Sequence, residues 1–316
     1  IEQVIEPMMK DGKEAVGSMG DDTPMAAFSD KQRNFSDFFK QKFAQVTNPP
    51  IDSIREKVVM SLNTGFGEIH NILDDASSHA HRLKAISPIV TKEKLSVLLS
   101  FGDESNARFQ PCYKNKTFST AYSGNMQESL EALVNDISKA VKEEGVRIVV
   151  LSDEEFSAEK ATIPMLMAVG RLNHKLLENG NRHLVSIVAQ TGEVYDSHSA
   201  ASMIAFGASA IFPYLLFSTA LARLDQSAGL TMSCHIAMKS VHTALNGGLL
   251  KIMSKMGIST IASYRNSSLF DVLGLSSEIC SECFSDGQSL VPGLGYADIV
   301  SPTLATTATL AYEDNV

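Results

Sequence analysis

Between residues 126 and 212, short apolar runs rich in β-branched residues alternate with longer amphipathic segments. Apolar spacing of three and four residues predicts helices, and unbroken apolar runs predict buried strands. The pattern predicts helices over 126–144, 163–178 and 199–206, and strands over 146–151, 184–189 and 210–212. Strands that alternate with helices are typical of stacked βα units. We therefore expect an α/β fold with a parallel sheet or a barrel.

The rest of the chain is less regular. Residues 1–28 are rich in glycine and lack periodicity, so they predict a loop or arm. Phenylalanines at helical spacing predict a helix over 30–46, which must end before the two prolines of Thr47-Asn48-Pro49-Pro50. Weaker patterns predict helices over 52–62, 78–86 and 91–100, and a strand over 108–113. A further helix is expected after Ser276.

Composition excludes several classes of protein. The 316 residues include 44% apolar ones, which is enough for a large core and excludes a disordered chain. The formal net charge of −9 repels phosphate backbones, so nucleic acid is excluded as a partner. No run is long enough to cross a membrane. The chain starts at Ile1 with no basic n-region and no apolar h-region, so we expect no signal peptide and, with four unevenly spaced cysteines, a cytoplasmic protein. The missing initiator Met predicts a piece of something longer.

One long stretch is almost without charge. Residues 197–250 carry only Arg223, Asp225 and Lys239 as charged side chains. A free-standing domain normally needs more solvated surface than this. Two explanations remain open: these helices are unusually buried, or part of their surface meets another domain.

The residues that carry chemistry form no complete site in the sequence. Cys280-Ser281-Glu282-Cys283 is a single C-x-x-C without a second ligand pair, so two incidental cysteines are the better interpretation. His198 follows a predicted strand, where α/β sites gather, yet a lone histidine there is more often structural. Gly293-Leu294-Gly295 lacks the third glycine of a dinucleotide-binding loop. Asp21-Asp22 is more typical of a turn than of a metal site.

Several segments resemble the central domain of glutamate synthase. They are residues 17–24 (GSMGDDTP), 43–52 (FAQVTNPPID), 163–193, 207–215 and 248–260 (GLLKIMSKMGIST). The resemblance implies a rudimentary or incomplete (β/α)8 barrel with an N-terminal arm and helices. It also implies an arm over 1–28, the central domain over 29–245, and a connector over 246–316 that resembles the start of the FMN-binding domain.

The resemblance implies a connecting role rather than catalysis. In that family the whole enzyme makes two glutamates from glutamine and 2-oxoglutarate with reducing equivalents, FMN and an iron–sulfur cluster. It implies no cofactor, metal ligand or catalytic residue in this chain, which alone would be inactive. Its partners would be the other domains of the large subunit and an NADPH-oxidising small subunit. Thr47 and Asn48 match a motif near the entrance of the family's ammonia channel, although a rigid turn between domains explains them equally well.

The sequence departs from the family pattern at three places. Phe212 replaces an asparagine, Arg265-Asn266-Ser267-Ser268 replaces Arg-Gly-Ala-Gln, and the residues after Val291 differ. Two other functions stay open beside the connecting role. One is a free-standing flavin- or phosphate-binding α/β enzyme, and the other is a non-catalytic interaction scaffold.

Overall fold

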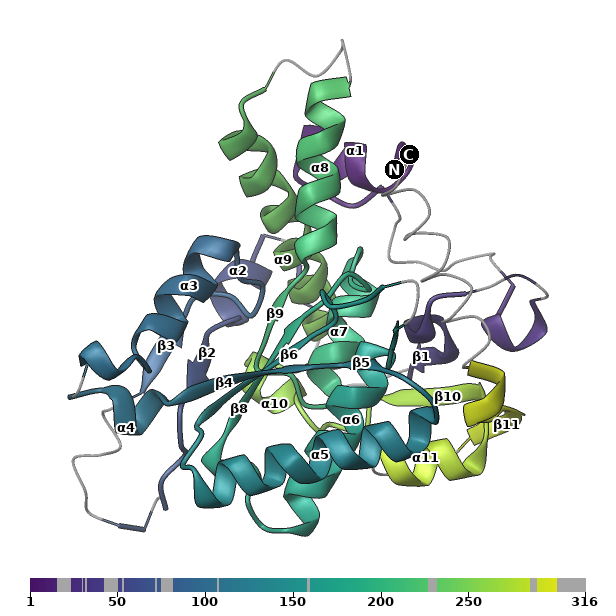
Figure 1. The fold of residues 1–316 in the computed structure, drawn as a ribbon. Coiled ribbons are helices and arrows are strands. Elements are labelled where there is room, and N and C mark those ends of the chain that lie inside the picture. Colours follow the sequence, from purple (N-terminus) through teal and green to yellow (C-terminus); the bar gives the residue numbers. More distant parts are fainter. Residues whose placement is uncertain are drawn as a thin grey trace.

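A four-stranded parallel sheet forms the centre of the computed structural model (Figure 1). The structure describes residues 1–15, 24–29, 31, 33–42, 51–52, 54–71, 73–74, 82–106, 108–157, 160–226, 232–284 and 289–299. The strands of the sheet are β4 (Asn115–Ser119), β6 (Ile148–Ser152), β8 (Ser186–Gln190) and β9 (Ala210–Phe212). The helices that follow them are α5 (Met126–Glu143), α6 (Met165–Glu178), α7 (Ser197–Ala205) and α8 (Tyr214–Gln226).

The strands lie side by side in the order in which they occur in the sequence. Every pair is parallel, with a helix in each connection. Neighbouring strands of a (β/α)8 barrel have the same order, but this sheet is open at β4. The prediction of stacked βα units in an incomplete barrel is therefore confirmed.

A capping residue, a terminating glycine and a fully buried strand explain why α5 and β6 lie where the sequence predicts them. Asn125 caps α5 by accepting a hydrogen bond from the Glu128 main-chain NH at 3.1 Å. The same helix stops at Gly145, whose φ of +74° suits glycine. All five residues of β6 are buried, as expected for a strand covered on both faces.

A second sheet corrects the prediction of a helix over 30–46. The described residues there form the 3₁₀ helix η2 (Phe35–Phe38) and the strand β1 (Phe39–Gln41). β1 pairs antiparallel with β10 (Phe270–Leu275), which pairs in turn with β11 (Ser289–Leu294). Phe35, Phe38 and Phe39 are buried, and the rings of Phe35 and Phe39 pack against Phe284, so the spacing of these three reflects long-range packing rather than a helix.

Short elements before residue 125 also differ from the sequence pattern. A helix, α4 (Gln110–Tyr113), replaces the strand predicted over 108–113, and β4 begins two residues later. β3 (Leu83–Ala85) lies where the helix 78–86 was predicted, and it pairs with β2 (Thr64–Phe66). α2 (Glu56–Val59) is shorter than predicted, whereas α3 (Lys92–Ser100) is confirmed. These segments are too short for hydrophobic periodicity to distinguish a helix from a strand. Their conformation is set by the residues that they pair with in the tertiary structure.

The segment predicted as an arm contains a helix, α1 (Ile5–Asp11). It buries Met8 and Met9 and contacts α9 (Cys234–Met256), near α8 in the upper part of Figure 1. α9 is continuous through the expected division between residues 245 and 246. The other described elements are η1 (Ala26–Phe28), η4 (Glu104–Asn106), β5 (Ala121–Tyr122), β7 (Ala161–Thr162), η5 (Arg182–Leu184), α10 (Ile261–Tyr264) and α11 (Ser277–Cys283).

Burial accounts for part of the uncharged stretch 197–250. In α7 every residue from Ser199 to Ala205 is buried, and this helix also contacts α9. On α8 and α9, Leu215 and Ile236 keep about half of their surface exposed, at 45% and 53%. Among the described residues, no helix combines the length and the apolar character needed to cross a membrane.

Candidate functional site

The carboxyl edge of the central sheet holds a group of acidic and hydroxyl side chains. Asp153 follows β6, Thr191 and Glu193 follow β8, and Tyr214 opens α8 directly after β9 and Pro213. The strands are parallel, so their carboxyl ends meet at one edge. Binding and catalytic residues of parallel α/β folds usually lie at this edge.

Asp153 is a buried carboxylate in this group, with 5% of its surface exposed. Its carboxylate accepts hydrogen bonds from the Thr191 hydroxyl at 2.6 Å and from the Gly192 main-chain NH at 3.1 Å. The Tyr214 hydroxyl also donates to it. Burial raises the pKa of Asp153, and these hydrogen bonds oppose the rise only in part.

Glu193 ties the edge of the sheet to the start of α6. Its Oε1 accepts a hydrogen bond from the main-chain NH of Met165, the first residue of that helix, at 2.9 Å. Its own main-chain NH donates to the Thr191 hydroxyl at 3.1 Å. Burial, together with the negative charge of Asp153, raises the pKa of Glu193 to about 8. Glu193 is therefore mostly protonated at pH 7.

Two neighbouring carboxyl groups of this kind can share a proton or bind a cationic or hydrogen-donating group. They do not suit FMN, the cofactor of the resembled enzyme. None of Asp153, Thr191, Glu193 and Tyr214 carries a positive charge, so this group offers no cation to pair with a flavin phosphate. The residues at this edge therefore do not fit a flavin phosphate.

His198, the histidine singled out in the sequence, lies outside this group. It belongs to α7, and its Nε2 is 3.0 Å from the main-chain oxygen of Ser36. Its ring packs edge-on against Phe270, with 6.0 Å between ring centroids. His198 therefore joins α7 to η2 and β10.

Cys280 and Cys283 are buried on α11, in the helix expected after Ser276. Burial raises the pKa of Cys280 to about 11 and that of Cys283 to about 12, so both thiols are neutral at pH 7. The Cys283 Sγ lies 3.6 Å from the Tyr296 hydroxyl. Within the described ranges, no three His, Cys, Asp or Glu side chains are grouped so that they could hold a metal ion.

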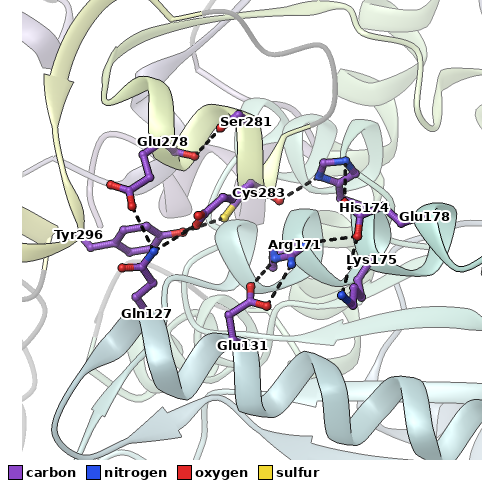
Figure 2. A network of polar contacts seen from close by, with 11 residues as sticks. Gln127, Glu131, Arg171, His174, Lys175, Glu178, Glu278, Ser281, Cys283 and Tyr296 are labelled. Atoms are coloured by element: carbon purple, nitrogen blue, oxygen red, sulfur yellow. Dashed lines mark hydrogen bonds and ion pairs between the residues drawn. The ribbon is translucent and has the colours of Figure 1, made fainter.

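A polar network surrounds Cys283 and joins α5, α6 and α11 (Figure 2). Arg171 on α6 makes a two-pronged ion pair with Glu131 on α5. The Tyr296 hydroxyl donates to Glu282 at 2.7 Å. From α5, Gln127 reaches Glu278 at 3.2 Å. These contacts hold the segment after residue 276 against α5 and α6, which is a structural role.

The remaining candidates divide into two sets. Thr47, Asn48, Asp21 and Asp22 lie outside the described residues, so the channel assignment stays a prediction. Gly293, in β11, lies against the main chain of Gly274 in β10, so it permits close strand packing and does not open a phosphate loop.

The acidic group at the sheet edge was not predicted from the sequence. A usable signal was present, because Asp153 and Glu193 follow the predicted strands 146–151 and 184–189 by two and four residues. Their partnership depends on strand order, which the pattern alone does not supply.

The fold and the site define the chain as an α/β domain with the strand order of part of a (β/α)8 barrel. Its carboxyl edge carries the acidic side chains of Asp153 and Glu193. Residues 1–276 match the family described as glutamate synthase central domain. The chain belongs to this family.

Relatives carry this segment within much longer chains. The glutamate synthase [NADPH] large chain of Bacillus subtilis (strain 168) is 34% identical over 93% of this chain and 19% of its own length. The ferredoxin-dependent glutamate synthase of Pyropia yezoensis is 37% identical over 96% of this chain and 20% of its own length. The chain thus spans about a fifth of the length of these relatives.

Among solved structures, the flavin-binding domain of baker's yeast flavocytochrome b2 is similar at a TM-score of 0.36 and 15% identity. The similarity covers 65% of this chain and 42% of that one. A likeness of this size does not establish a shared fold.

Proposed function

We propose that this chain is the connecting domain of a glutamate synthase large subunit. The observation that carries the proposal is the family match over residues 1–276, in relatives that are about five times longer. The other domains of such a protein would hydrolyse glutamine, bind FMN and an iron–sulfur cluster, and make two glutamates from glutamine and 2-oxoglutarate. This chain would join the glutaminase domain to the FMN domain and would not catalyse a reaction alone.

Within this role, Thr47 and Asn48 line part of the ammonia channel. Two prolines directly after them stiffen the backbone, and a hydroxyl and an amide are suited to guide a small polar molecule. The three sequence modules, 1–28, 29–245 and 246–316, stay a prediction about how the full-length protein is divided.

The test is the replacement of Thr47 by phenylalanine in the full-length protein. A blocked channel lowers glutamine-dependent glutamate formation and leaves the rate with added ammonia unchanged. Thr117→Phe, at an exposed position of β4, is the matched control and should change neither rate. If Thr47→Phe leaves the ratio of the two rates unaltered, the channel role is wrong.

We further propose that the electron donor is NADPH, oxidised by a small subunit, and that the protein works in the cytoplasm. Relatives that use NADPH and relatives that use ferredoxin match almost equally well. Glutamate formation by the full-length protein with NADPH, NADH or reduced ferredoxin decides among them.

A flavin titration tests whether the domain is itself a flavin enzyme. Residues 1–316 expressed alone should not bind FMN, because the group at the sheet edge has no positively charged side chain to pair with its phosphate. A yellow protein that binds FMN tightly would contradict the connecting role.

A further inference from the structure

Three arginines lie together at the amino edge of the sheet, opposite the acidic group. Arg182 belongs to η5, and its Nη2 donates to the main-chain oxygen of Gly207 at 2.7 Å. Arg265 follows α10, and its Nε donates to the main-chain oxygen of Ala208 at 3.2 Å. Bonds to consecutive carbonyl groups place these two guanidinium groups next to each other.

Arg82, the residue just before β3, approaches the same place. Arg265 reaches Thr64 of β2 through a hydrogen bond of 3.3 Å from its Nη2 to the hydroxyl. Arg82 lies against the next residue, Gly65, where an added Cβ would be 2.9 Å from the Arg82 Nη2. The glycine leaves the space that the Arg82 guanidinium fills.

The hairpin of β2 and β3 positions these arginines at the ends of two central strands. The Thr64 hydroxyl donates to the main-chain oxygen of Ser209, just before β9, at 2.8 Å. The main-chain NH of Gly67 donates to the hydroxyl of Ser186, at the start of β8, at 3.2 Å. All three guanidinium groups therefore converge on the amino ends of β8 and β9.

The three cations lack a carboxylate partner among the described residues. Arg147, by contrast, pairs with Glu68 at 3.1 Å, and Arg223 pairs with Glu6 at 2.7 Å. The Nε of Arg82 is buried without any hydrogen-bond partner. A buried charge without a partner is costly, and a buried like-charged neighbour adds to the cost.

Burial and the positive charges of neighbouring arginines lower the pKa values of Arg182 and Arg265. Burial and the charge of Arg265 lower the pKa of Arg182 to about 9. Burial and the charge of Arg82 lower the pKa of Arg265 to about 10. An anion between these groups would offset the repulsion between the guanidinium charges. It would also give the buried Arg82 Nε an acceptor.

We propose that Arg82, Arg182 and Arg265 form a binding site for an oxyanion, that is, a carboxylate or phosphate group, at the amino edge of the sheet. Guanidinium groups bind such groups through paired N–H···O bonds, and the Arg82 Nε is free to donate one. The oxyanion is either dissolved in the solvent or carried as a carboxylate by a segment outside the described residues. The proposal does not depend on the connecting role.

The test uses the full-length protein, inorganic phosphate as the probe, and the thermal midpoint of unfolding at matched ionic strength with chloride. Arg82→Met is the informative variant, because it removes the one guanidinium group of the three whose buried Nε has no hydrogen-bond partner. Arg82→Lys keeps the charge. Arg55→Met removes an exposed arginine and is the control for the change in net charge.

Two results support the site and identify the source of the oxyanion. A dissolved oxyanion predicts that phosphate raises the midpoint of the wild type and of Arg55→Met, whereas Arg82→Met needs at least about tenfold more phosphate, as expected for one lost charge-assisted contact. A carboxylate from the protein itself predicts no effect of phosphate, a lowered midpoint for Arg82→Met at every concentration, and recovery in Arg82→Lys.

Three results would overturn the proposal. In the first, Arg82→Met unfolds at the wild-type temperature or above it and phosphate acts no more strongly than chloride. In the second, phosphate stabilises Arg82→Met as much as the wild type. In the third, Arg82→Lys loses as much stability as Arg82→Met, which would show that packing rather than charge is lost.

Discussion

At the scale of single residues, burial raises the pKa of the Glu193 carboxyl group far above its usual value. The carboxyl group faces the buried Asp153 and accepts a hydrogen bond from the first residue of α6. Its pKa of about 8 in the folded protein exceeds the usual value of 4.5. The folded protein thus keeps a proton that the unfolded chain releases between these two values.

This difference predicts how stability depends on pH. The free energy of unfolding should fall as the pH rises from about 4.5 to about 8, since the folded state holds more protons there. Glu193→Gln should flatten this dependence and raise stability at pH 8 by at least about 1.4 kcal/mol, the equivalent of one pKa unit. Urea unfolding at several pH values checks it. Glu128→Gln, at an exposed position of α5, is the control, and an unchanged slope in Glu193→Gln would contradict the prediction.

Asn266 shows a second effect at the residue scale. Its φ of +56° lies in the left-handed region that glycine prefers, and glycine is the residue expected here from the family pattern. The asparagine side chain compensates in part by accepting a hydrogen bond from Asn173 at 2.8 Å. The departure from the family at this position is therefore tolerated through a local contact.

Two substitutions at this position separate backbone strain from the side-chain contact. Asn266→Ala and Asn266→Gly both lose the hydrogen bond, but only glycine relaxes the backbone. We expect the alanine variant to be less stable than the glycine variant by about 1 kcal/mol. Chemical unfolding of both proteins gives the difference, and equal stabilities would show that the backbone is not strained.

At the scale of elements, glycines decide how closely helices pack. Gly170 on α6 faces the end of α11, where an added Cβ would lie 2.8 Å from the Phe284 ring. Gly247 on α9 faces open space, with nothing within 4 Å of an added Cβ. Glycine thus allows close helix packing at Gly170. At Gly247 it brings no packing gain and only lowers the stability of α9 through its backbone freedom.

Alanine substitutions at the two glycines should therefore have opposite effects. Gly170→Ala forces α6 and α11 apart and should destabilise the protein by about 1–3 kcal/mol, the usual cost of overpacking. Gly247→Ala removes backbone freedom from the unfolded chain and should stabilise it by about 0.5–1 kcal/mol. Thermal unfolding compares both with the wild type. A stabilised Gly170→Ala variant would show that these helices do not meet as described.

At the scale of the whole molecule, an aromatic cluster joins segments from both ends of the chain. Phe39 of β1 contacts Phe206 and Phe284, with ring centroids 5.0 and 4.8 Å away. Phe270 of β10 lies 6.0 Å from Phe206. The amino-terminal part, the central βα units and the segment after residue 245 therefore share one core.

This shared core predicts where the chain tolerates truncation. A chain that ends at residue 299 should unfold cooperatively, whereas one that ends at 245 should not. The shorter chain loses β10, Phe270, Phe284 and half of α9, which leaves β1 unpaired and the cluster open to water. Circular dichroism melts and binding of a hydrophobic dye measure the outcome. A cooperative transition in the shorter chain would mean that the later segment is not needed for folding.

Much of the architecture between residues 126 and 212 is predictable from the sequence. The helices and strands there begin and end within about two residues of the expected positions, because periodicity, caps and glycine stops act over a few neighbouring residues. The assignments before residue 125 fail for the opposite reason. Phe39 and Leu83 lie in short strands whose partners, not their neighbours, determine their conformation.

The sequence by itself determined the α/β class, the alternation of strands and helices between residues 126 and 212, and the resemblance to the glutamate synthase central domain. These depend on local patterns and on motifs that are contiguous in the chain. Only the tertiary structure brought Asp153 to Glu193 at one edge of the sheet, and Arg82 to Arg265 at the other. Charge proximity and burial depend here on residues that lie 40 and 183 positions apart, and spacing along the chain carries no record of either.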